Sequence, residues 1–573
     1  MNQNRQTTTT TGWFEKGLAA QDSGQAEIAI EAYLKAIKSD PRDFAATYNL
    51  ATLYHDLNQL EPARQAYIKA IKLNPTLTPA FKGLGDLLFA LKDIEPALSL
   101  YKQALKIDPR LAAVWHNIGH IEQHRSNLSE ALSAYRKAIE LQPDYKSALD
   151  SLTKLSLKIG ATQEIVSFLN DLDNNFPQNH YLKTALAEIF YNLHEPEKSL
   201  HHIHAALNVE KQNGEAFNLI GLILMQRGEV NAARFNFKKA CDLAPNSLKI
   251  NSNLLYSCLT DPATTPKEYL KETQMWWRRH GAPMAAKTVF NHKCPLTDNR
   301  PIRLGFISAD FQYHSVSFFF LPLIRELDNI PDKRFTIYCY SDSLTEDEYT
   351  NRIKEHSDYW YSIYGLDDGV VAEVIVTDKI DILVELSGHT SNNRLAVIAR
   401  QAAPVQFSWL GYPASTGIEN NTYRLSDNIC DPEEFQAHYS ETLTYIKPPF
   451  LNYAPPPETE NLIISQKNAP DGKVVFASFN NAAKINHKVI ELWAIILQRL
   501  PGATLFFKTR TLKSEAAADF CKKRFTEQGI APEKIVIDSN NYPTVEHFES
   551  YNRVDIALDP FPYNGTTTTC DAL

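Results

Sequence analysis

The sequence predicts an α-helical solenoid followed by two α/β lobes. Over residues 10–250, prolines and small residues recur with a period of 34, which is typical of stacked helix pairs. From residue 301 onward, strand-like and helix-like runs alternate, and the pattern restarts after Pro455-Pro456-Pro457. Such alternation predicts mostly parallel sheets with helices on both faces. A chain of 573 residues is long enough for several domains.

The repeated region, residues 10–250, contains about seven copies of the 34-residue unit. The positions in phase are Pro41, Pro75, Pro109, Pro143, Pro177 and Pro245, then Ala36, Ala70, Ala104, Ala138, Ala206 and Ala240, with Tyr33, Tyr67, Tyr101, Tyr135 and Phe237 three residues before an alanine. This is the tetratricopeptide pattern, in which small residues lie where two antiparallel helices cross and proline closes the second helix. The fifth copy carries Thr153, Ile165 and Leu172 at small-residue positions, and we expect it to bend the stack.

A solenoid of this kind has a long groove that can hold an extended peptide. Asn49 and Asn117 occupy the same phase of two repeats, where their amides could clamp the backbone of an acceptor peptide. The other repeats carry different residues there, so the alternative is that both are ordinary solvated helix residues.

Residues 251–300 lose the 34-residue period and are predicted to form a helical linker. A helix is expected from Tyr269 to Arg279, with Trp276 and Trp277 packing the solenoid onto the following lobe. The segment 293–300 contains Pro295 and is predicted to be an extended connection.

Two α/β lobes are predicted, over residues 301–455 and 470–573. The strands expected in the first lobe are 303–310, 335–341, 380–387 and 405–410, with a helix at 394–400. The second lobe is expected to have strands at 474–479, 504–507, 534–538 and 554–559, and helices at 487–500, 514–528 and 544–551. Two consecutive doubly wound lobes should face each other across a cleft, with ligands at the carboxyl ends of their strands.

Polar residues follow several of these strands. The segment 310–314 follows the first strand, 480–484 follows the strand at 474–479, and 564–571 follows the last strand. The last of these has one glycine, four threonines and Asp571, which indicates a helix N-terminus that could bind an anion. The alternative is an ordinary threonine N-cap.

Composition excludes several classes of function. The net charge of −9 gives no global basic surface for nucleic acid or anionic membranes. The seven cysteines form no C-x-x-C pair, so neither a metal site nor a disulfide framework is predicted. There is no P-loop lysine motif, no G-x-G-x-x-G, no apolar signal core and no run long enough for a membrane span, so we expect a cytoplasmic protein.

Four motifs behind the repeats resemble the O-linked GlcNAc transferase and SPINDLY-like family, glycosyltransferase family 41. They are Gly305–His314, Trp409–Pro413, Ser478–Lys484 and Asn564–Asp571. The resemblance implies a GT-B fold made of two Rossmann-like lobes. It also implies inverting transfer from a nucleotide sugar to Ser or Thr of a protein, without metal or resident cofactor.

The resemblance also implies roles for individual residues. Lys484 matches a lysine that would stabilise the leaving diphosphate, and His314 matches a histidine once proposed as the base. Alternatively, His314 would position the substrates, or simply cap the helix that begins at 315. The residues implied in nucleotide-sugar binding are Asn481, His547, Thr566, Thr567, Thr568 and Asp571, the last holding the ribose.

Three positions depart from the family pattern, and they bear on which nucleotide and sugar the protein uses more than on the type of reaction. Thr544 and Ser550 stand where many members carry Lys and Arg, and Tyr359 stands where a histidine is common. Our main prediction is a transferase that uses UDP-GlcNAc. The alternatives are an O-fucosyl- or Asn-glucosyl-type transferase, or a scaffold of tetratricopeptide repeats with a silent transferase domain.

The last ten residues would only begin a helix, which is a poor place to end a domain. Family members continue well past this position. We therefore expect the second lobe to be truncated, and the 573-residue chain to show weak or no turnover by itself.

Overall fold

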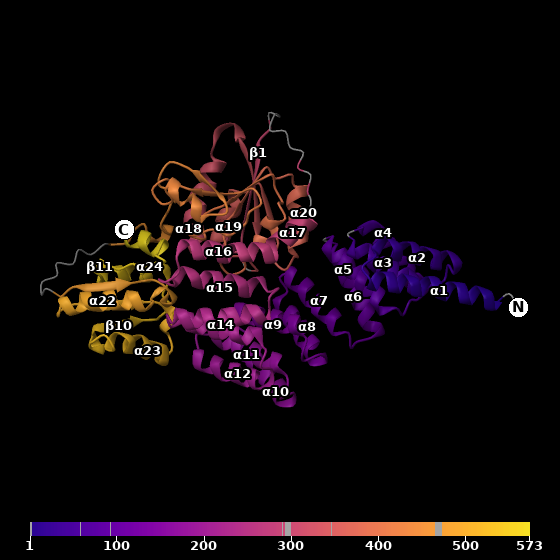
Figure 1. Ribbon diagram of the computed structural model, residues 1–573, viewed down its shortest axis with the longest axis horizontal. Coiled ribbons are helices and arrows are strands. Elements are labelled where there is room, and N and C mark those ends of the chain that lie inside the picture. The colour runs from indigo at the N-terminus through magenta and orange to yellow at the C-terminus, as the bar shows by residue number, and fades with distance from the viewer. Residues whose placement is uncertain are drawn as a thin grey trace. The chain divides into compact units, whose positions relative to one another are not determined.

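The computed structural model describes residues 3–57, 59–91, 93–288, 290, 292, 300–344, 346–463 and 473–573, with side chains from residue 12 onward. The expected connection at 293–300 lies outside the described residues except for its last position, as does the expected start of the second lobe at 470. The chain divides into two compact units, residues 1–185 and 186–573 (Figure 1). Each is described here by itself.

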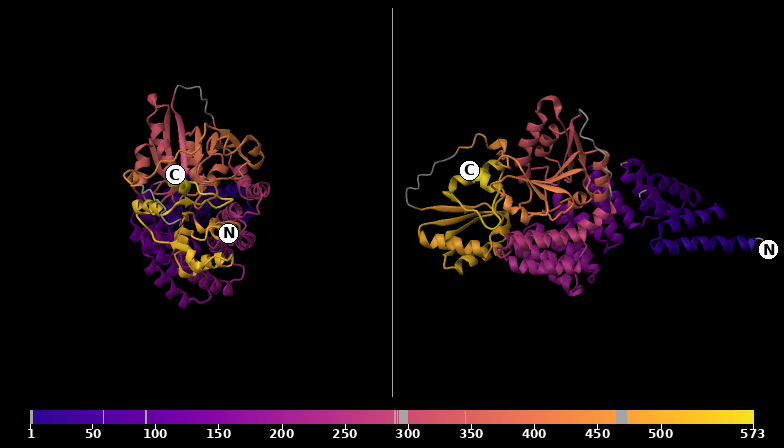
Figure 2. Two further views of the ribbon diagram at one scale, coloured as in Figure 1. Left: turned by 90° about the vertical axis from the view of Figure 1, so that its left-hand side faces the viewer. Right: turned by 45° about the horizontal axis from the view of Figure 1, so that its top comes forward.

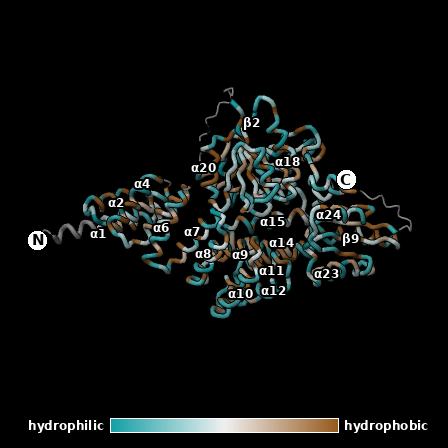
Figure 3. Tube along the Cα trace, turned by 180° about the vertical axis from the view of Figure 1, so that it is seen from behind, coloured by the Kyte–Doolittle hydropathy of each residue, from teal (hydrophilic) through white to brown (hydrophobic). Residues whose placement is uncertain are grey.

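The first unit consists of antiparallel helix pairs, as the period predicts. The helices are α1 (Gln3–Asp22), α2 (Ala26–Ser39), α3 (Phe44–Asp56), α4 (Leu60–Leu73), α5 (Thr78–Ala90), α6 (Ile94–Ile107), α7 (Ala112–His124), α8 (Leu128–Leu141), α9 (Lys146–Ile159) and α10 (Thr162–Asn175), and α11 (His180–Asn192) spans the boundary between the units. Hydrophobic and hydrophilic segments alternate along these helices, as expected where each helix buries one face (Figure 3).

In four of the repeats an aromatic residue lies against a glycine of the partner helix. Tyr135 on α8 is fully buried, and a Cβ added to Gly119 on α7 would lie 2.4 Å from its ring. The same close approach joins Gly85 to Tyr101, so the predicted role of the small residues is confirmed. In the fifth repeat Thr153 and Ile165 are also buried, and the bend expected there stays a prediction.

The second unit begins with the end of the solenoid. Its helices are α12 (Pro196–Val209), α13 (Gly214–Gln226), α14 (Val230–Leu243), α15 (Leu248–Thr260) and α16 (Pro266–Trp276), followed by the π-helical turn η1 (Trp277–Gly281) and α17 (Ala282–Lys287). Figure 1 shows α14, α15 and α16 stacked in order next to the first lobe. Trp276 and Trp277 are buried in one cluster with Ile398 and Ile418 of that lobe, which confirms their predicted packing.

The first lobe is a seven-stranded parallel sheet in the order β3-β2-β1-β4-β5-β6-β7. The strands are β1 (Ile302–Ser308), β2 (Phe335–Ser341), β3 (Tyr359–Ser362), β4 (Ile382–Glu385), β5 (Val405–Ser408), β6 (Thr422–Ser426) and β7 (Thr442–Tyr445). The helices are α18 (Ser315–Asp328), α19 (Glu348–Glu355), α20 (Asp368–Thr377) and α21 (Leu395–Ala399). Strands β1, β2, β4 and β5 match the predicted ones, whereas β3, β6 and β7 were not predicted.

The second lobe has a four-stranded parallel sheet in the order β10-β9-β8-β11. Its strands are β8 (Val475–Ser478), β9 (Thr504–Lys508), β10 (Ile535–Asp538) and β11 (Ile556–Ala557), and its helices are α22 (His487–Arg499), α23 (Glu515–Thr526), α24 (Thr544–Glu549) and α25 (Thr567–Ala572). The right-hand view of Figure 2 separates this sheet from the larger one. Among the described residues, no helix has both the length and the hydropathy needed to cross a membrane.

The contact between Gly119 and Tyr135 predicts a size limit at position 119. Gly119→Leu should lower the free energy of unfolding by about 1–3 kcal/mol, because the ring has no room to move away from the added carbons. The matched control is Gly12→Leu on α1, where an added Cβ would meet nothing within 4 Å. Urea unfolding followed by circular dichroism measures both, and equal midpoints for the two variants would contradict the packing argument.

Candidate active site

Three parts of the second unit surround a cavity of about 410 Å³. The solenoid contributes Tyr191, Gln226, Asn253 and Tyr256, the first lobe Asp310, His314, His389, Thr390 and Ser391, and the second lobe Asn481. The two lobes contribute loops that follow β1, β4 and β8, so the cavity lies at the carboxyl ends of parallel strands, where the sequence predicts a ligand.

His314 is the N-cap of α18, and its Nδ1 accepts a hydrogen bond of 3.3 Å from the N–H of Val316. The same Nδ1 lies 3.7 Å from Oδ1 of Asp310. A ring that accepts at Nδ1 carries its proton on Nε2 when neutral, and that nitrogen then donates rather than accepts. The helix-capping role considered for His314 is therefore seen in the structure, together with its position in the cavity wall.

Asp310 is a further titratable residue in this wall, to which the family resemblance gives no role. It stands just beyond the end of β1, mostly buried, and burial raises the pKa of its carboxyl while the charge of His314 opposes that shift. If the Nδ1 proton of His314 faced Asp310, Nε2 would be free to accept a proton. A carboxylate four residues before a histidine, both at a strand end, was a signal for this pair in the sequence.

Lys484 ends the 3-10 turn η5 (Ala482–Lys484) after β8. Its Nζ donates a 2.8 Å hydrogen bond to the carbonyl of Asn564 and lies 4.1 Å from the ring centroid of Tyr563. Burial lowers the pKa of Lys484 from 10.5 to about 8, and the charge of Asp559 partly opposes this. The structure thus brings the ammonium to the start of the threonine-rich segment. Asn481 caps the same turn, its Oδ1 accepting from the N–H of Ala483 at 2.9 Å.

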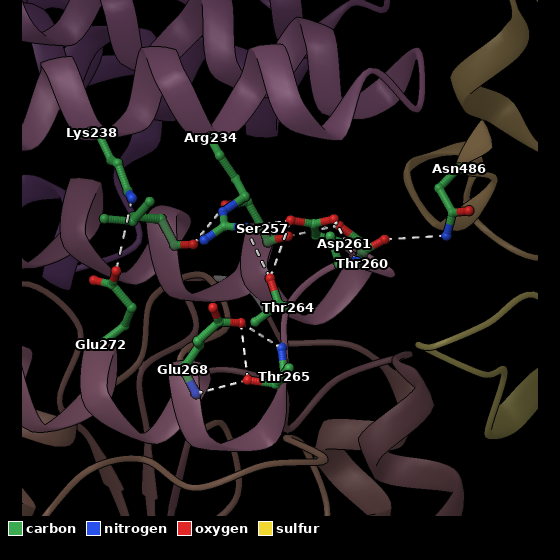
Figure 4. A network of polar contacts seen from close by, with 12 residues as sticks. Arg234, Lys238, Ser257, Thr260, Asp261, Thr264, Thr265, Glu268, Glu272 and Asn486 are labelled. Carbon is green, nitrogen blue, oxygen red and sulfur yellow. Dashed lines mark hydrogen bonds and ion pairs between the residues drawn. The ribbon is translucent and has the colours of Figure 1, made fainter. Parts of the chain in front are cut away.

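Asn486 holds this turn in place (Figure 4). Its side chain is fully buried, and its Nδ2 donates to the carbonyls of Thr260 at 3.2 Å and Phe561 at 2.6 Å. Thr260 ends α15, next to Asp261, which forms an ion pair with Arg234 of α14 (Figure 4). The loop that carries Lys484 is therefore fastened to the last solenoid helices and to the turn before the threonines.

The threonine-rich segment forms the short helix α25. Thr566 precedes it at the N-cap position, and its side chain makes no capping hydrogen bond, so the ordinary threonine cap considered from the sequence is not formed. Thr567 is the first helical residue, and the Oγ1 of Thr568 lies 3.4 Å from Oδ1 of Asn480. Thr569 donates 2.7 Å to Oδ2 of Asp559.

A second cavity, of about 300 Å³, lies between this segment and the ends of β8 and β11, with Asn480, Asp559 and Thr568 in its wall. Polar groups of Asn480, Asp559, Thr568 and Thr569 thus share the wall of this cavity with apolar residues such as Phe479 and Leu558.

Asp571 accepts a hydrogen bond from the hydroxyl of Tyr453, which follows β7 in the first lobe. Burial raises the pKa of Asp571 to about 6, and the bond from Tyr453 opposes that shift. The carboxylate that the resemblance assigns to the ribose is therefore bonded to a phenol in this structure, so a ribose hydroxyl would have to share or replace this contact.

His547 lies on α24, edge-on to Phe479 with ring centroids 5.8 Å apart and an angle of 87°. Phe479 also stacks on Tyr551 at 3.8 Å. The pKa of His547 is lowered by burial and, to a lesser degree, by the charges of Lys508 and Arg510. Phe479 lines the second cavity, so the structure brings His547 to the neighbourhood of Thr568.

The structure shows the contacts of the three residues that depart from the family pattern. Thr544 lies 2.9 Å from the hydroxyl of Tyr313, linking the second lobe to the first. Ser550 is buried and donates to the carbonyl of Glu546. Tyr359 stacks on Tyr338 at 4.5 Å on the edge strand β3.

Asn49 and Asn117 lie in the first unit, whereas His314 and Lys484 lie in the second. The Nδ2 of Asn117 donates to Oδ1 of Asp86 at 2.7 Å and contacts the hydroxyl of Tyr101 at 3.3 Å. Asn49 lies near the phenol of Tyr33 and lowers its pKa against the effect of burial. The amide of Asn117 thus bonds within the helix stack, and contact of either amide with an acceptor peptide stays a prediction.

The model of the family named Glycosyl transferase family 41 matches residues 281–452 and 458–573, and tetratricopeptide models match 14–78, 85–123, 112–145 and 214–247. Two curated relatives are named as probable UDP-N-acetylglucosamine–peptide N-acetylglucosaminyltransferase SPINDLY. The relative from Oryza sativa subsp. japonica is 32% identical over 342 residues, 59% of this chain and 36% of its own length. The relative from Arabidopsis thaliana is 36% identical over 278 residues, 48% of this chain and 30% of its own.

A solved structure, a mutant of the O-GlcNAc transferase from Thermobaculum terrenum, superposes with a TM-score of 0.64 at 25% identity, covering 80% of each chain. The chain spans about a third of the length of the curated relatives that it matches. The family model covers both lobes of the second unit, including the loops that carry His314, Lys484 and the threonine-rich segment. The chain therefore belongs to glycosyltransferase family 41.

Proposed function

We propose that the protein is a glycosyltransferase that transfers a sugar from a nucleotide sugar, preferably GlcNAc from UDP-GlcNAc, to Ser or Thr hydroxyls of acceptor proteins. The observation that carries this proposal is the position of Lys484. Its ammonium reaches the start of the threonine-rich segment, and its loop also places Asn481 in the cavity wall that contains His314. The names of the relatives and of the solved structure support the choice of donor.

In this proposal the second lobe stabilises the leaving nucleoside diphosphate without a metal. Negative charge grows on the diphosphate as the glycosidic bond breaks, and a fixed cation with hydroxyl and N–H donors lowers the energy of that state. Lys484 supplies the charge, and Thr566, Thr567 and Thr568 supply donors. Asp571 accepts from ribose hydroxyls, while His547 contacts the nucleotide beside the Phe479 ring.

The acceptor enters through the cavity between the solenoid and the lobes, with the tetratricopeptide groove as its path. Attack on the far side of the anomeric carbon inverts its configuration, and the acceptor hydroxyl must lose its proton. His314 can take that proton only in the arrangement where Nδ1–H points to Asp310, since its present bond from Val316 leaves the proton on Nε2. In its present arrangement His314 positions substrates by donating from Nε2.

Lys484→Met should lower kcat by about 100-fold or more, because a charge stabilising the leaving group is lost. The assay is transfer of labelled sugar from UDP-GlcNAc, with GDP-fucose and UDP-glucose in parallel, to an acceptor protein. Lys488→Met is the matched control, since that lysine lies on α22 and pairs with Glu491. Undiminished turnover by Lys484→Met would remove the lysine from the mechanism. Absence of transfer from all three donors by the full-length protein would favour a scaffold.

Asp571→Asn should weaken nucleotide binding about 10- to 100-fold, because a charged acceptor for the ribose hydroxyls is lost. Calorimetry with UDP and GDP side by side measures this, with Asp519→Asn on α23 as the control. Because the pKa of Asp571 is about 6, wild-type affinity should also fall as the pH drops through 6, and this component should be missing in Asp571→Asn. Unchanged affinity in the variant would exclude the assigned contact.

A further inference from the structure

Two tyrosines connect Lys484 to the solenoid. Tyr563 stands in the turn before the threonine-rich segment, and the Nζ of Lys484 lies 4.1 Å from its ring centroid. Tyr256 belongs to α15, and its ring centroid is 5.7 Å from that of Tyr563 with an angle of 67° between the planes. Tyr256 also lines the cavity of about 410 Å³. Neither residue has a role in the function proposed above.

The ring of Tyr563 is important for the charge of Lys484, because the other groups around this lysine compensate its charge weakly. Within the described part of the chain Lys484 forms no salt bridge, and its hydrogen-bond partner is a neutral carbonyl. Asp559 is the carboxylate that acts on it electrostatically, and that group is already bonded by Thr569. An aromatic face attracts a partly desolvated ammonium, so the Tyr563 ring stabilises the charged form that catalysis requires.

Tyr256 determines where that ring lies. The two rings lie against each other and the two phenols interact through their hydroxyl groups, and burial raises the pKa of both phenols well above neutrality, so both keep their protons. The helix that carries Tyr256 is held at its end by the bond from Asn486 to Thr260 and by the ion pair of Asp261 with Arg234. The orientation of the Tyr563 ring is thus set from the solenoid side.

We propose that Tyr563 and Tyr256 are a positioning pair for Lys484: the Tyr563 ring stabilises and places the ammonium, and Tyr256 fixes that ring from the last solenoid helix. This inference rests on the proposed function of Lys484. Because Tyr256 also faces the acceptor cavity, an acceptor bound there contacts the residue that orients the ring beneath the catalytic ammonium.

The test compares Tyr563→Leu, which removes the aromatic face, with Tyr563→Phe, which keeps it, and with Tyr256→Phe, which removes the hydroxyl contact. The first readout is the titration of Lys484 in the full chain, followed by competitive acetylation and mass spectrometry. Tyr563→Leu should lower the pKa of Lys484 by about one unit, Tyr563→Phe by much less, and Tyr256→Phe by an intermediate amount. Tyr542→Leu is the matched control, because that ring lies 3.9 Å from Lys508 instead, and it should leave the Lys484 titration unchanged.

The second readout is the pH profile of kcat for transfer from UDP-GlcNAc. Its alkaline limb should move down by the same amount in Tyr563→Leu, with kcat at pH 8 lowered about 5-fold and KM for the donor changed less. The acetylation titration needs no activity, so it tests the pair even if the proposed function fails. Equal Lys484 titrations in wild type and Tyr563→Leu, or an equal shift in Tyr563→Phe, would overturn the inference. Circular dichroism confirms that each variant is folded.

Discussion

The second unit is built around one partly buried ammonium group. Burial disfavours the charge of Lys484, and the structure compensates with a carbonyl, an aromatic face and a more distant carboxylate rather than with an ion pair. A direct carboxylate partner would neutralise the charge that a leaving diphosphate needs. Neutral partners hold the ammonium of Lys484 in place without cancelling its positive charge. Because these partners are weak, the loops around the ammonium must be held by other contacts.

The contacts that hold the Lys484 loop make the end of the solenoid part of the candidate active site. Helices α13 to α15 belong to the same compact unit as both lobes, and Asn486 ties the Lys484 loop to the end of α15. Helix α15 contributes Asn253 and Tyr256 to the cavity wall, and Tyr191 comes from α11. In the function proposed above, the last repeats thus support the loop that acts on the donor as well as lining the path of the acceptor.

Strong periodic signals were predictable, and short or irregular ones were not. The 34-residue period and the buried strands β1, β2, β4 and β5 were predicted because each repeats a local pattern or forms a long apolar run. Strands β3, β6 and β7 mix polar and aromatic residues and are only partly buried, so no apolar run marks them, and the sheet pairings that define them cannot be read locally. Among the site residues, Lys484 and the threonine-rich segment were found through motifs, whereas Tyr256 and Tyr563 acquire their positions through contacts distant in sequence.

The sequence by itself determined the class of each region, because helix crossing and strand burial depend on residue size and hydropathy at fixed spacing. It also placed the candidate catalytic residues at strand ends. The tertiary structure decided their states: His314 accepts at Nδ1, Asp571 is bonded to Tyr453, and Lys484 lies on Tyr563. Protonation and orientation depend on the desolvation and partners of each group, and these arise from residues that the chain brings together only when folded.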